Sequence, residues 1–257
     1  MAHPLLQSLI HAPLLIEDLP EAPTFPRHQL ILPADHPALN FEQKLGHLYE
    51  DALALLLDHS PSYELLERNL QIQKDRHTTV GELDFLLRET DSEHLIHLEL
   101  ATKFYLAVET DGVLTLPGPD ARDNYFRKLA RLRTHQLQLP LNFRRHLPEK
   151  YRDQPIATQQ LIIGCLFDHI ETTAPATAEF LNPNCRRGRW LDIDELPQHF
   201  SSRTRFHIIP KPLWPVPIEF LNPAQLEPWS PGTPLKRHLM VRADDRPEPY
   251  FIRPSQN

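Results

Sequence analysis

Two carboxylates and one lysine stand in a segment that otherwise has the pattern of two apolar β-strands. Residues 81–106 read GELDFLLRETDSEHLIHLELATKFYL, with Asp84 in the first predicted strand and Glu99 and Lys103 in the second. Burying a charge without a partner is costly. Carboxylates and a lysine placed together can hold a divalent cation and activate water for hydrolysis, which is the chemistry that these residue types suggest.

The alternation of side chains along a strand places these charges on one face. His97, Glu99 and Lys103 share a face of the second strand, whose other face is almost wholly apolar, and Glu82 and Asp84 share a face of the first. If the two strands pair as a hairpin, Asp84 and Glu99 lie side by side. Two adjacent carboxylates repel unless a proton, a lysine or a cation compensates, and Mg²⁺ or Mn²⁺ suits oxygen ligands.

The simplest alternative to a cation site is a half-exposed sheet face whose charges point at water, with Lys103 neutralising one carboxylate. The flanking helix favours the cation site over this alternative. A helix is predicted over residues 40–58, beginning at the capping-box pair Asn40 and Gln43. Its apolar residues recur at helical spacing. Glu50 lies on an adjoining polar stripe, within reach of the two carboxylates.

The order of these residues resembles the PD-(D/E)XK nuclease superfamily, which has a glutamate on the first helix, an aspartate on the second strand, and a glutamate and a lysine on the third. The strings HLELATKFYL and GPDARDNYFRKLARLRTHQL also resemble a family of uncharacterised bacterial proteins placed in that superfamily. The resemblance implies a restriction-endonuclease-like core and a nuclease that uses Mg²⁺ or Mn²⁺. It implies Asp84 and Glu99 as metal ligands, and Glu50 as a third acidic ligand or a residue just behind them.

The chain departs from the superfamily's Glu-x-Lys pattern at the lysine. Residue 101 is alanine, and Lys103 follows two residues later on the same face. This moves the lysine about 6.6 Å along the strand, at ~3.3 Å per residue. Ala101 is small enough for the long lysine side chain to lean back over it, so Lys103 is predicted as the third catalytic residue, beside Asp84 and Glu99.

A second helix is predicted over residues 120–139, capped by Asp120. Gln136 is a polar interruption of its core-facing stripe, and the resemblance makes it a candidate for the site; a partly exposed glutamine at a helix end is the alternative. Lys128 and Arg131 lie on a basic stripe beside it and are predicted to contact phosphate.

Charge is distributed unevenly along the chain, whose formal net charge is −7. Residues 1–120 contain 7 Lys and Arg against 20 Asp and Glu, whereas residues 121–257 contain 20 against 14. Residues 127–152 alone contain eight Lys and Arg and one acid. Such a run is often only a solvated face, but it also suits a sugar-phosphate backbone, which binds Lys and Arg without regard to sequence. Nucleic acid is therefore the expected partner.

Other sites and compartments have weaker support. The two cysteines make no disulfide framework, and the 15 histidines are scattered without the spacing of a zinc site. Only His97 falls on the carboxylate face. No apolar run reaches the ~18 residues of a spanning helix. The N-terminal residues lack the basic region of a signal peptide, so we expect a cytoplasmic protein without a membrane association.

Three regions are predicted from the element pattern: an irregular N-terminal arm (1–40), a PD-(D/E)XK-like core (41–173), and a C-terminal region (174–257) that is packed on the core and holds 14 of the 27 prolines. Within the core the order is helix, three strands, helix and strand. That order predicts an α/β fold, with a small mixed central sheet flanked by helices and a proline-rich C-terminal extension.

These observations leave three functions open. The first is a metal-dependent phosphodiesterase acting on nucleic acid, with DNA as the expected substrate. The second is a non-catalytic module that binds nucleic acid or protein and keeps a nuclease-like fold, which the displaced lysine and the net acidic charge favour. The third is a purely structural ion network.

Overall fold

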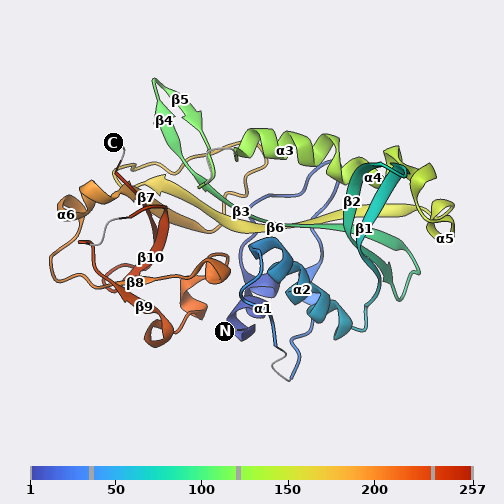
Figure 1. Ribbon diagram of the computed structural model, residues 1–257, viewed down its shortest axis with the longest axis horizontal. Coiled ribbons are helices and arrows are strands. Elements are labelled where there is room, and N and C mark those ends of the chain that lie inside the picture. The colour runs from blue at the N-terminus through green and yellow to red at the C-terminus, as the bar shows by residue number, and fades with distance from the viewer. Residues whose placement is uncertain (1, 35–37, 120–122, 233–234, 256–257) are drawn as a thin grey trace.

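The computed structural model describes residues 2–34, 38–119, 123–232 and 235–255 (Figure 1). Within these residues the strands are β1 (Tyr63–Asp75), β2 (Thr78–Glu89), β3 (Leu95–Leu106), β4 (Val108–Thr110), β5 (Val113–Thr115), β6 (Ile156–His169), β7 (Arg187–Asp192), β8 (Phe206–Ile208), β9 (Glu227–Trp229), β10 (Leu239–Ala243) and β11 (Pro249–Arg253). The α-helices are α1 (Ala2–His11), α2 (Leu45–Asp58), α3 (Tyr125–Thr134), α4 (Leu139–Asn142), α5 (Glu149–Arg152) and α6 (Leu196–His199). Short 3₁₀ turns are η1 (Arg27–Gln29), η2 (Gln136–Gln138), η3 (Arg144–His146), η4 (Ile193–Glu195), η5 (Lys211–Leu213), η6 (Ile218–Phe220) and η7 (Pro223–Gln225).

One large mixed sheet organises the described residues. Its nine strands run in the order β1-β2-β3-β6-β7-β11-β10-β8-β9, and β4 and β5 form a separate hairpin. The pairs β3–β6, β6–β7 and β7–β11 are parallel, and the other neighbours are antiparallel. The expected α/β fold with a mixed sheet is confirmed, but the expectation of a small sheet is wrong. The strands β7 to β11 extend it, and most are too short and too interrupted by proline to show a clear sequence pattern.

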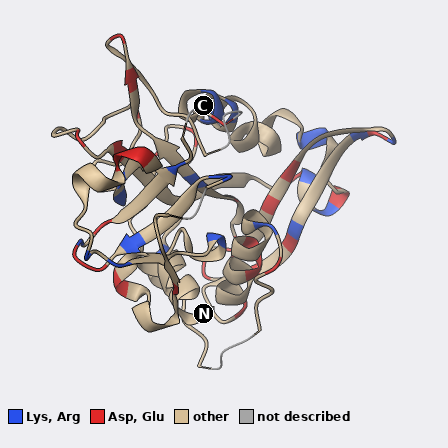
Figure 2. Cartoon of the chain, turned by 60° about the vertical axis from the view of Figure 1, so that its left-hand side comes forward, with Lys and Arg blue, Asp and Glu red and all other residues tan. Residues whose placement is uncertain are grey.

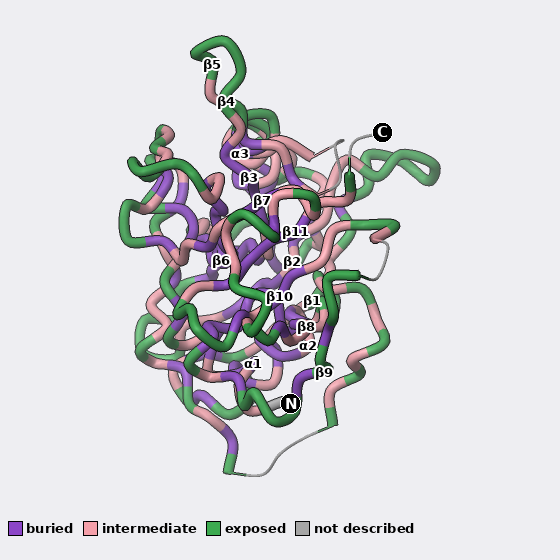
Figure 3. The backbone as a smooth tube through the Cα atoms, turned by 90° about the vertical axis from the view of Figure 1, so that its left-hand side faces the viewer, coloured by how far each residue is buried: buried purple, intermediate pink, exposed green. Residues whose placement is uncertain are grey.

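Helices cover both faces of the sheet's centre. Alternate residues of β3, among them Ile96, Leu98 and Phe104, join the main core with α1 and α2, below the sheet in Figure 1. Tyr105 joins a second core with Tyr125 of α3, which lies above the sheet. The buried stretches gather in the middle of the molecule, while the β4–β5 hairpin projects from it (Figure 3).

The N-terminal segment contains a helix, α1, that its prolines conceal in the sequence. Pro4 falls in the first turn, where a backbone N–H has no helical partner to lose. Beyond α1 the chain crosses the α3 side of the sheet, and the Leu15 N–H donates to the carbonyl of Ile162 (2.8 Å). None of the described helices is long and apolar enough to cross a membrane.

Both predicted helices are shorter than their sequence patterns. The first begins at Leu45, and Asn40 instead accepts a hydrogen bond from the Glu42 N–H (3.0 Å) in a separate turn. The second, α3, is capped by Asn124 and ends at Thr134. The predicted cap Asp120 lies outside the described residues.

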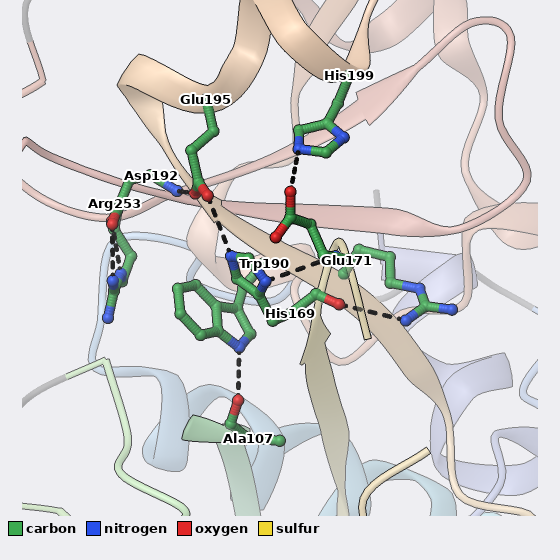
Figure 4. A network of polar contacts seen from close by, with 9 residues as sticks. Ala107, His169, Glu171, Trp190, Asp192, Glu195, His199 and Arg253 are labelled. Carbon is green, nitrogen blue, oxygen red and sulfur yellow. Dashed lines mark hydrogen bonds and ion pairs between the residues drawn. The ribbon is translucent and has the colours of Figure 1, made fainter. Parts of the chain in front are cut away.

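The C-terminal strands are fixed to the rest of the sheet by a polar network at the end of β7 (Figure 4). Arg253 donates two hydrogen bonds to the Asp192 carboxylate (2.7 and 2.9 Å), and its guanidinium lies 4.0 Å from the ring centre of Trp190. The Trp190 indole N–H donates to the carbonyl of Ala107 (2.8 Å). These bidentate and cation–π contacts hold β7 and β11 against the end of β3.

Candidate functional site

The β2–β3 pair separates where the predicted carboxylates lie. The β2–β3 ladder spans four residue pairs and ends at Phe85 and Leu98. On the far side of this point β2 follows β1 in a long ribbon that carries acidic and basic residues (Figure 2). The Leu100 N–H donates to Asp84 Oδ2 (2.9 Å). The carboxylate of Asp84 therefore takes the place of a strand carbonyl, and a fork opens beside Glu99.

A cavity of about 1110 Å³ lies at this fork. It is lined from β3, α3, the start of α2, the C-terminal region and, in the N-terminal arm, Leu15 and Ile16, so all three predicted regions of the chain contribute to it. Its acidic lining residues are Glu50, Asp84, Glu99 and Asp123, and its basic ones are Lys103, Lys128, Arg131, Lys211 and Arg237. The apolar side chains of Leu100, Phe104, Ile209 and Trp214 also line it. We call this cavity the cleft.

Asp84 and Glu99 both line the cleft, and their charges repel each other. Burial, followed by repulsion from Glu99, raises the pKa of Asp84 well above its usual range. Burial also raises the pKa of Glu99, and the Gln136 side chain and the charge of Lys103 oppose that rise. Only 7% of Glu99 is exposed. The pair therefore holds at least one proton near neutral pH unless another positive charge arrives.

Glu50 lies at the edge of this pair and has partners of its own. Its Oε2 accepts a hydrogen bond from Asn69 Nδ2 (3.1 Å) and lies 3.3 Å from His47 Nδ1. Its charge adds to the rise in the pKa of Asp84 and Glu99. Among the described residues, no group of three or more His, Cys, Asp and Glu side chains is arranged to hold a metal ion. The acidic side chains that interact here are thus Asp84 and Glu99, with Glu50 at their edge.

His97 lies behind Glu99 on the same face and is completely buried. Burial lowers its pKa to about 3, so the ring is neutral at physiological pH. Its Nε2 is 3.7 Å from Glu99 Oε2. Neither ring nitrogen nor this carboxylate oxygen has a hydrogen-bond partner among the residues that the structure describes. The oxygen without a partner marks a position where a cation or a donor would be stabilised.

Lys103 lines the cleft from the strand of Glu99. Burial lowers the pKa of its ammonium, while Asp123, and then Glu99 and Asp84, favour the charged form. The resulting side chain is a partly desolvated cation close to the two carboxylates. Lys103 thus lines the same cleft as Asp84 and Glu99, on β3 and two residues beyond Ala101.

The backbone at Lys103 requires a glycine on the neighbouring strand. Gly164 of β6 is its register partner, and a Cβ on Gly164 would come 1.7 Å from the Lys103 carbonyl oxygen. We expect Gly164→Ala to push β3 and β6 apart and to lower the free energy of unfolding by about 3 kcal/mol, at the upper end of overpacking costs. Chemical denaturation measures this.

Gly232→Ala is the matched control, because among the described residues no heavy atom beyond its chain neighbours lies within 4 Å of the Cβ position there. Its free energy of unfolding should stay within about 0.5 kcal/mol of wild type. Equal stabilities for the two variants would contradict the close approach at Lys103.

The second helix contributes the remaining predicted residues. Lys128 and Arg131 of α3 both line the cleft, and Lys128 Nζ lies 3.9 Å from Asp123 Oδ1. Gln136 falls in η2, just past the helix end, and its Oε1 lies 3.0 Å from His135 Nδ1. This contact leaves the Gln136 amide nitrogen free to donate a hydrogen bond to the Glu99 carboxylate. The break after α3 turns Gln136 towards the site.

Sequence reasoning missed the contribution of the C-terminal region. Lys211 of η5 and Arg237, just before β10, line the cleft although neither lies near a recognised motif. The only local signal is the string PKPLW, which places a lysine three residues before Trp214. Lys211 Nζ lies 5.9 Å from the Trp214 ring centre.

Comparisons with known proteins add one finding. A family model described as Domain of unknown function (DUF1853) matches residues 11–246. The match covers the cleft and every predicted site residue. No curated protein and no solved structure matches the chain significantly.

Proposed function

The chain belongs to the DUF1853 family, and from that premise we propose that it is a metal-dependent phosphodiesterase acting on nucleic acid, with DNA as the expected substrate. In this proposal α2, β1 to β3, α3 and β6 form a restriction-endonuclease-like core of the PD-(D/E)XK type. The family description names no activity, so the support comes from the cleft. Two free buried cysteines agree with the reducing cytoplasm, where we place the protein.

One observation carries the proposal: the half-buried Asp84 and the buried Glu99 repel each other in one cleft, and one oxygen of Glu99 has no partner among the described residues. Asp84 and Glu99 repel each other in a setting that raises both pKa values. Asp84 and Glu99 would hold a divalent cation, whose charge would remove the repulsion and would offer a partner to Glu99 Oε2. Two protein carboxylates are enough for Mg²⁺, which commonly fills its other positions with waters and substrate phosphate.

In this proposal each side chain has a separate role in the hydrolysis of a phosphodiester. Asp84 and Glu99 hold Mg²⁺ or Mn²⁺, which supplies positive charge to the scissile phosphate. Lys103 orients the attacking water and stabilises negative charge as it develops. The water oxygen bonds to phosphorus, the ester P–O bond breaks, and the proton lost by the water is balanced by one taken up at the leaving oxygen. Gln136 keeps the Glu99 carboxylate in place.

A non-catalytic nucleic-acid or protein-binding module is the second candidate. Ala101 stands where the superfamily pattern has its lysine, which is the specific observation in its favour. Such a protein would keep the cleft and its basic residues without turnover. Activity measurements, rather than binding measurements, separate the two candidates.

We expect wild-type protein with Mn²⁺ to cleave labelled DNA, tested as linear, branched and single-stranded forms. Asp84→Asn should lower the rate by about 10³-fold, the scale for removing a group that stabilises charge in the transition state. Asparagine keeps an oxygen that can accept the hydrogen bond from the Leu100 N–H, so the backbone contact at the fork is preserved. Gel assays of initial rate measure the loss.

Asp91→Asn, in the exposed turn between β2 and β3, is the matched control and should cleave at the wild-type rate. If wild type cleaves no form of DNA while it still binds Mn²⁺, the non-catalytic candidate replaces the proposal. Equal rates for wild type and Asp84→Asn would mean that the activity does not use this site.

A further inference from the structure

We propose that the cleft binds one unpaired nucleic-acid strand between two basic walls, the second of which is made by Lys211 and Arg237 of the C-terminal region. This inference rests on the proposed function and names its substrate class. The first wall is the α3 surface with Lys128 and Arg131. All four cations line the same cavity, although the two pairs are more than 70 residues apart in the chain.

The two walls stand on different sides of the β3 edge that the fork leaves open. Residues of α3 pack into the core above the sheet, whereas Trp214, next to Lys211, belongs to the core that α1 and α2 form below it. Lys211 and Arg237 are exposed, and within the described residues no carboxylate forms an ion pair with either. In the first wall Lys128 has the Asp123 carboxylate 3.9 Å away, whereas no ion pair joins Arg131 to a carboxylate of the described residues. Cations on both sides of a carboxylate pair suit phosphates on both sides of a scissile bond.

The surface between the walls favours an unpaired strand over a duplex. The half-buried apolar side chains of Leu45, Leu132, Ile208 and Leu239 line the cleft together with its charged residues, and the edge of Trp214 adds an aromatic surface. A duplex turns its phosphates outward and its bases inward, so it has no apolar surface to offer this lining. An unpaired strand exposes its base faces, and grooves that bind such strands combine cations with apolar and aromatic side chains.

The second wall is held in place by packing rather than by a loose connection. The Trp214 ring meets Phe104 of β3 edge to face, with centroids 5.5 Å apart, and meets Phe251 of β11 at 5.2 Å. Its indole N–H donates to the carbonyl of Ile209 (2.9 Å). The parallel strands β7 and β11 and the network of Figure 4 attach this region to β3. The wall is therefore part of the site's rigid frame.

Equilibrium binding without cleavage tests the proposal. Fluorescence anisotropy with EDTA compares a short labelled DNA strand with the same sequence as a duplex over a range of salt. Lys211→Ala with Arg237→Ala should weaken binding of the single strand roughly tenfold near 0.1 M salt and reduce the salt slope by about 1.4, or ~0.7 per phosphate contact. Lys128→Ala with Arg131→Ala should act similarly. Lys236→Ala with Arg203→Ala changes two exposed cations that do not line the cleft, and should leave affinity unchanged.

Each outcome separates this inference from the function on which it rests. If the single strand binds as expected and Mn²⁺ produces no cleavage, the two-wall strand site stands and the phosphodiesterase proposal falls. If DNA is cleaved but Lys211→Ala with Arg237→Ala matches the Lys236 and Arg203 control, the second wall is wrong. Tighter binding of the duplex overturns the unpaired-strand assignment, and equal binding of poly-glutamate shows a general polyanion surface instead.

Discussion

Asp84→Asn is expected to stabilise the fold by about 3 kcal/mol near pH 8. This is about half of what the rise in the Asp84 pKa to about 8 corresponds to at about 1.4 kcal/mol per pKa unit, because Asp84 and Glu99 titrate as a pair. Burial and the neighbouring Glu99 raise the pKa of Asp84, so the folded chain binds a proton that the unfolded chain has released. The stability that this proton provides is fully present below about pH 4 and is lost as the pH rises through the raised pKa. Asparagine carries no such dependence and keeps an acceptor for the Leu100 N–H.

Chemical denaturation with EDTA at about pH 5 and about pH 8 measures this effect. The gain of Asp84→Asn over wild type should be small at the lower pH and grow towards the higher one. The control Asp91→Asn removes an exposed carboxylate from the turn between the same strands and should change stability by less than about 0.5 kcal/mol. An Asp84→Asn protein that is no more stable than wild type at pH 8 would show that the carboxylate pair is not under strain.

Lys103→Ala is expected to reduce the proposed cleavage by about 10³-fold while the protein stays folded. The ammonium is the cation that lines the cleft on the strand of Glu99; burial lowers its pKa, whereas Asp123 and then Glu99 and Asp84 favour its charged form. Alanine removes this charge but preserves the β3 backbone and its register with Gly164. Single-turnover kinetics with Mn²⁺ measures the loss, with circular dichroism to confirm the fold.

A compensating double variant tests the role of Lys103 in a second way. Ala101→Lys with Lys103→Ala returns the lysine to the superfamily position on the same strand face, and should recover part of the lost rate. Lys236→Ala, an exposed cation away from the cleft, should cleave as wild type does. Undiminished cleavage by Lys103→Ala would remove Lys103 from the mechanism.

The local part of the site could be predicted because it depends on strand periodicity. A period of two places Asp84 and Glu99 on one face once the hairpin forms, and the structure places both in one cleft. Glu50 and Gln136 followed from helical spacing, although both helices are shorter than predicted. The break after α3 did not move Gln136 away, because η2 continues the turn towards β3.

The long-range part of the site could not be predicted from local pattern. Lys211 and Arg237 reach the cleft only because β7 and β11 continue the sheet in parallel, which brings the C-terminal region back to β3. Strands of three to six residues separated by prolines carry too little alternation to show that order. The weak alternation in these short strands is also the reason why the sequence predicted a small sheet. The fork at Asp84 was also hidden, because it replaces a backbone hydrogen bond with a side-chain one.

Calorimetric titration of the metal-free protein with Mn²⁺ near pH 8 tests the central claim most directly, because it asks whether Asp84 and Glu99 form a cation site and needs no substrate. We predict one Mn²⁺ per wild-type chain, with release of protons as the carboxylate pair ionises. Asp84→Asn should abolish this binding although its fold is the more stable one, and Glu99→Gln should weaken it at least about tenfold. Absence of binding to wild type, or the same stoichiometry and affinity in Asp84→Asn, would contradict the account.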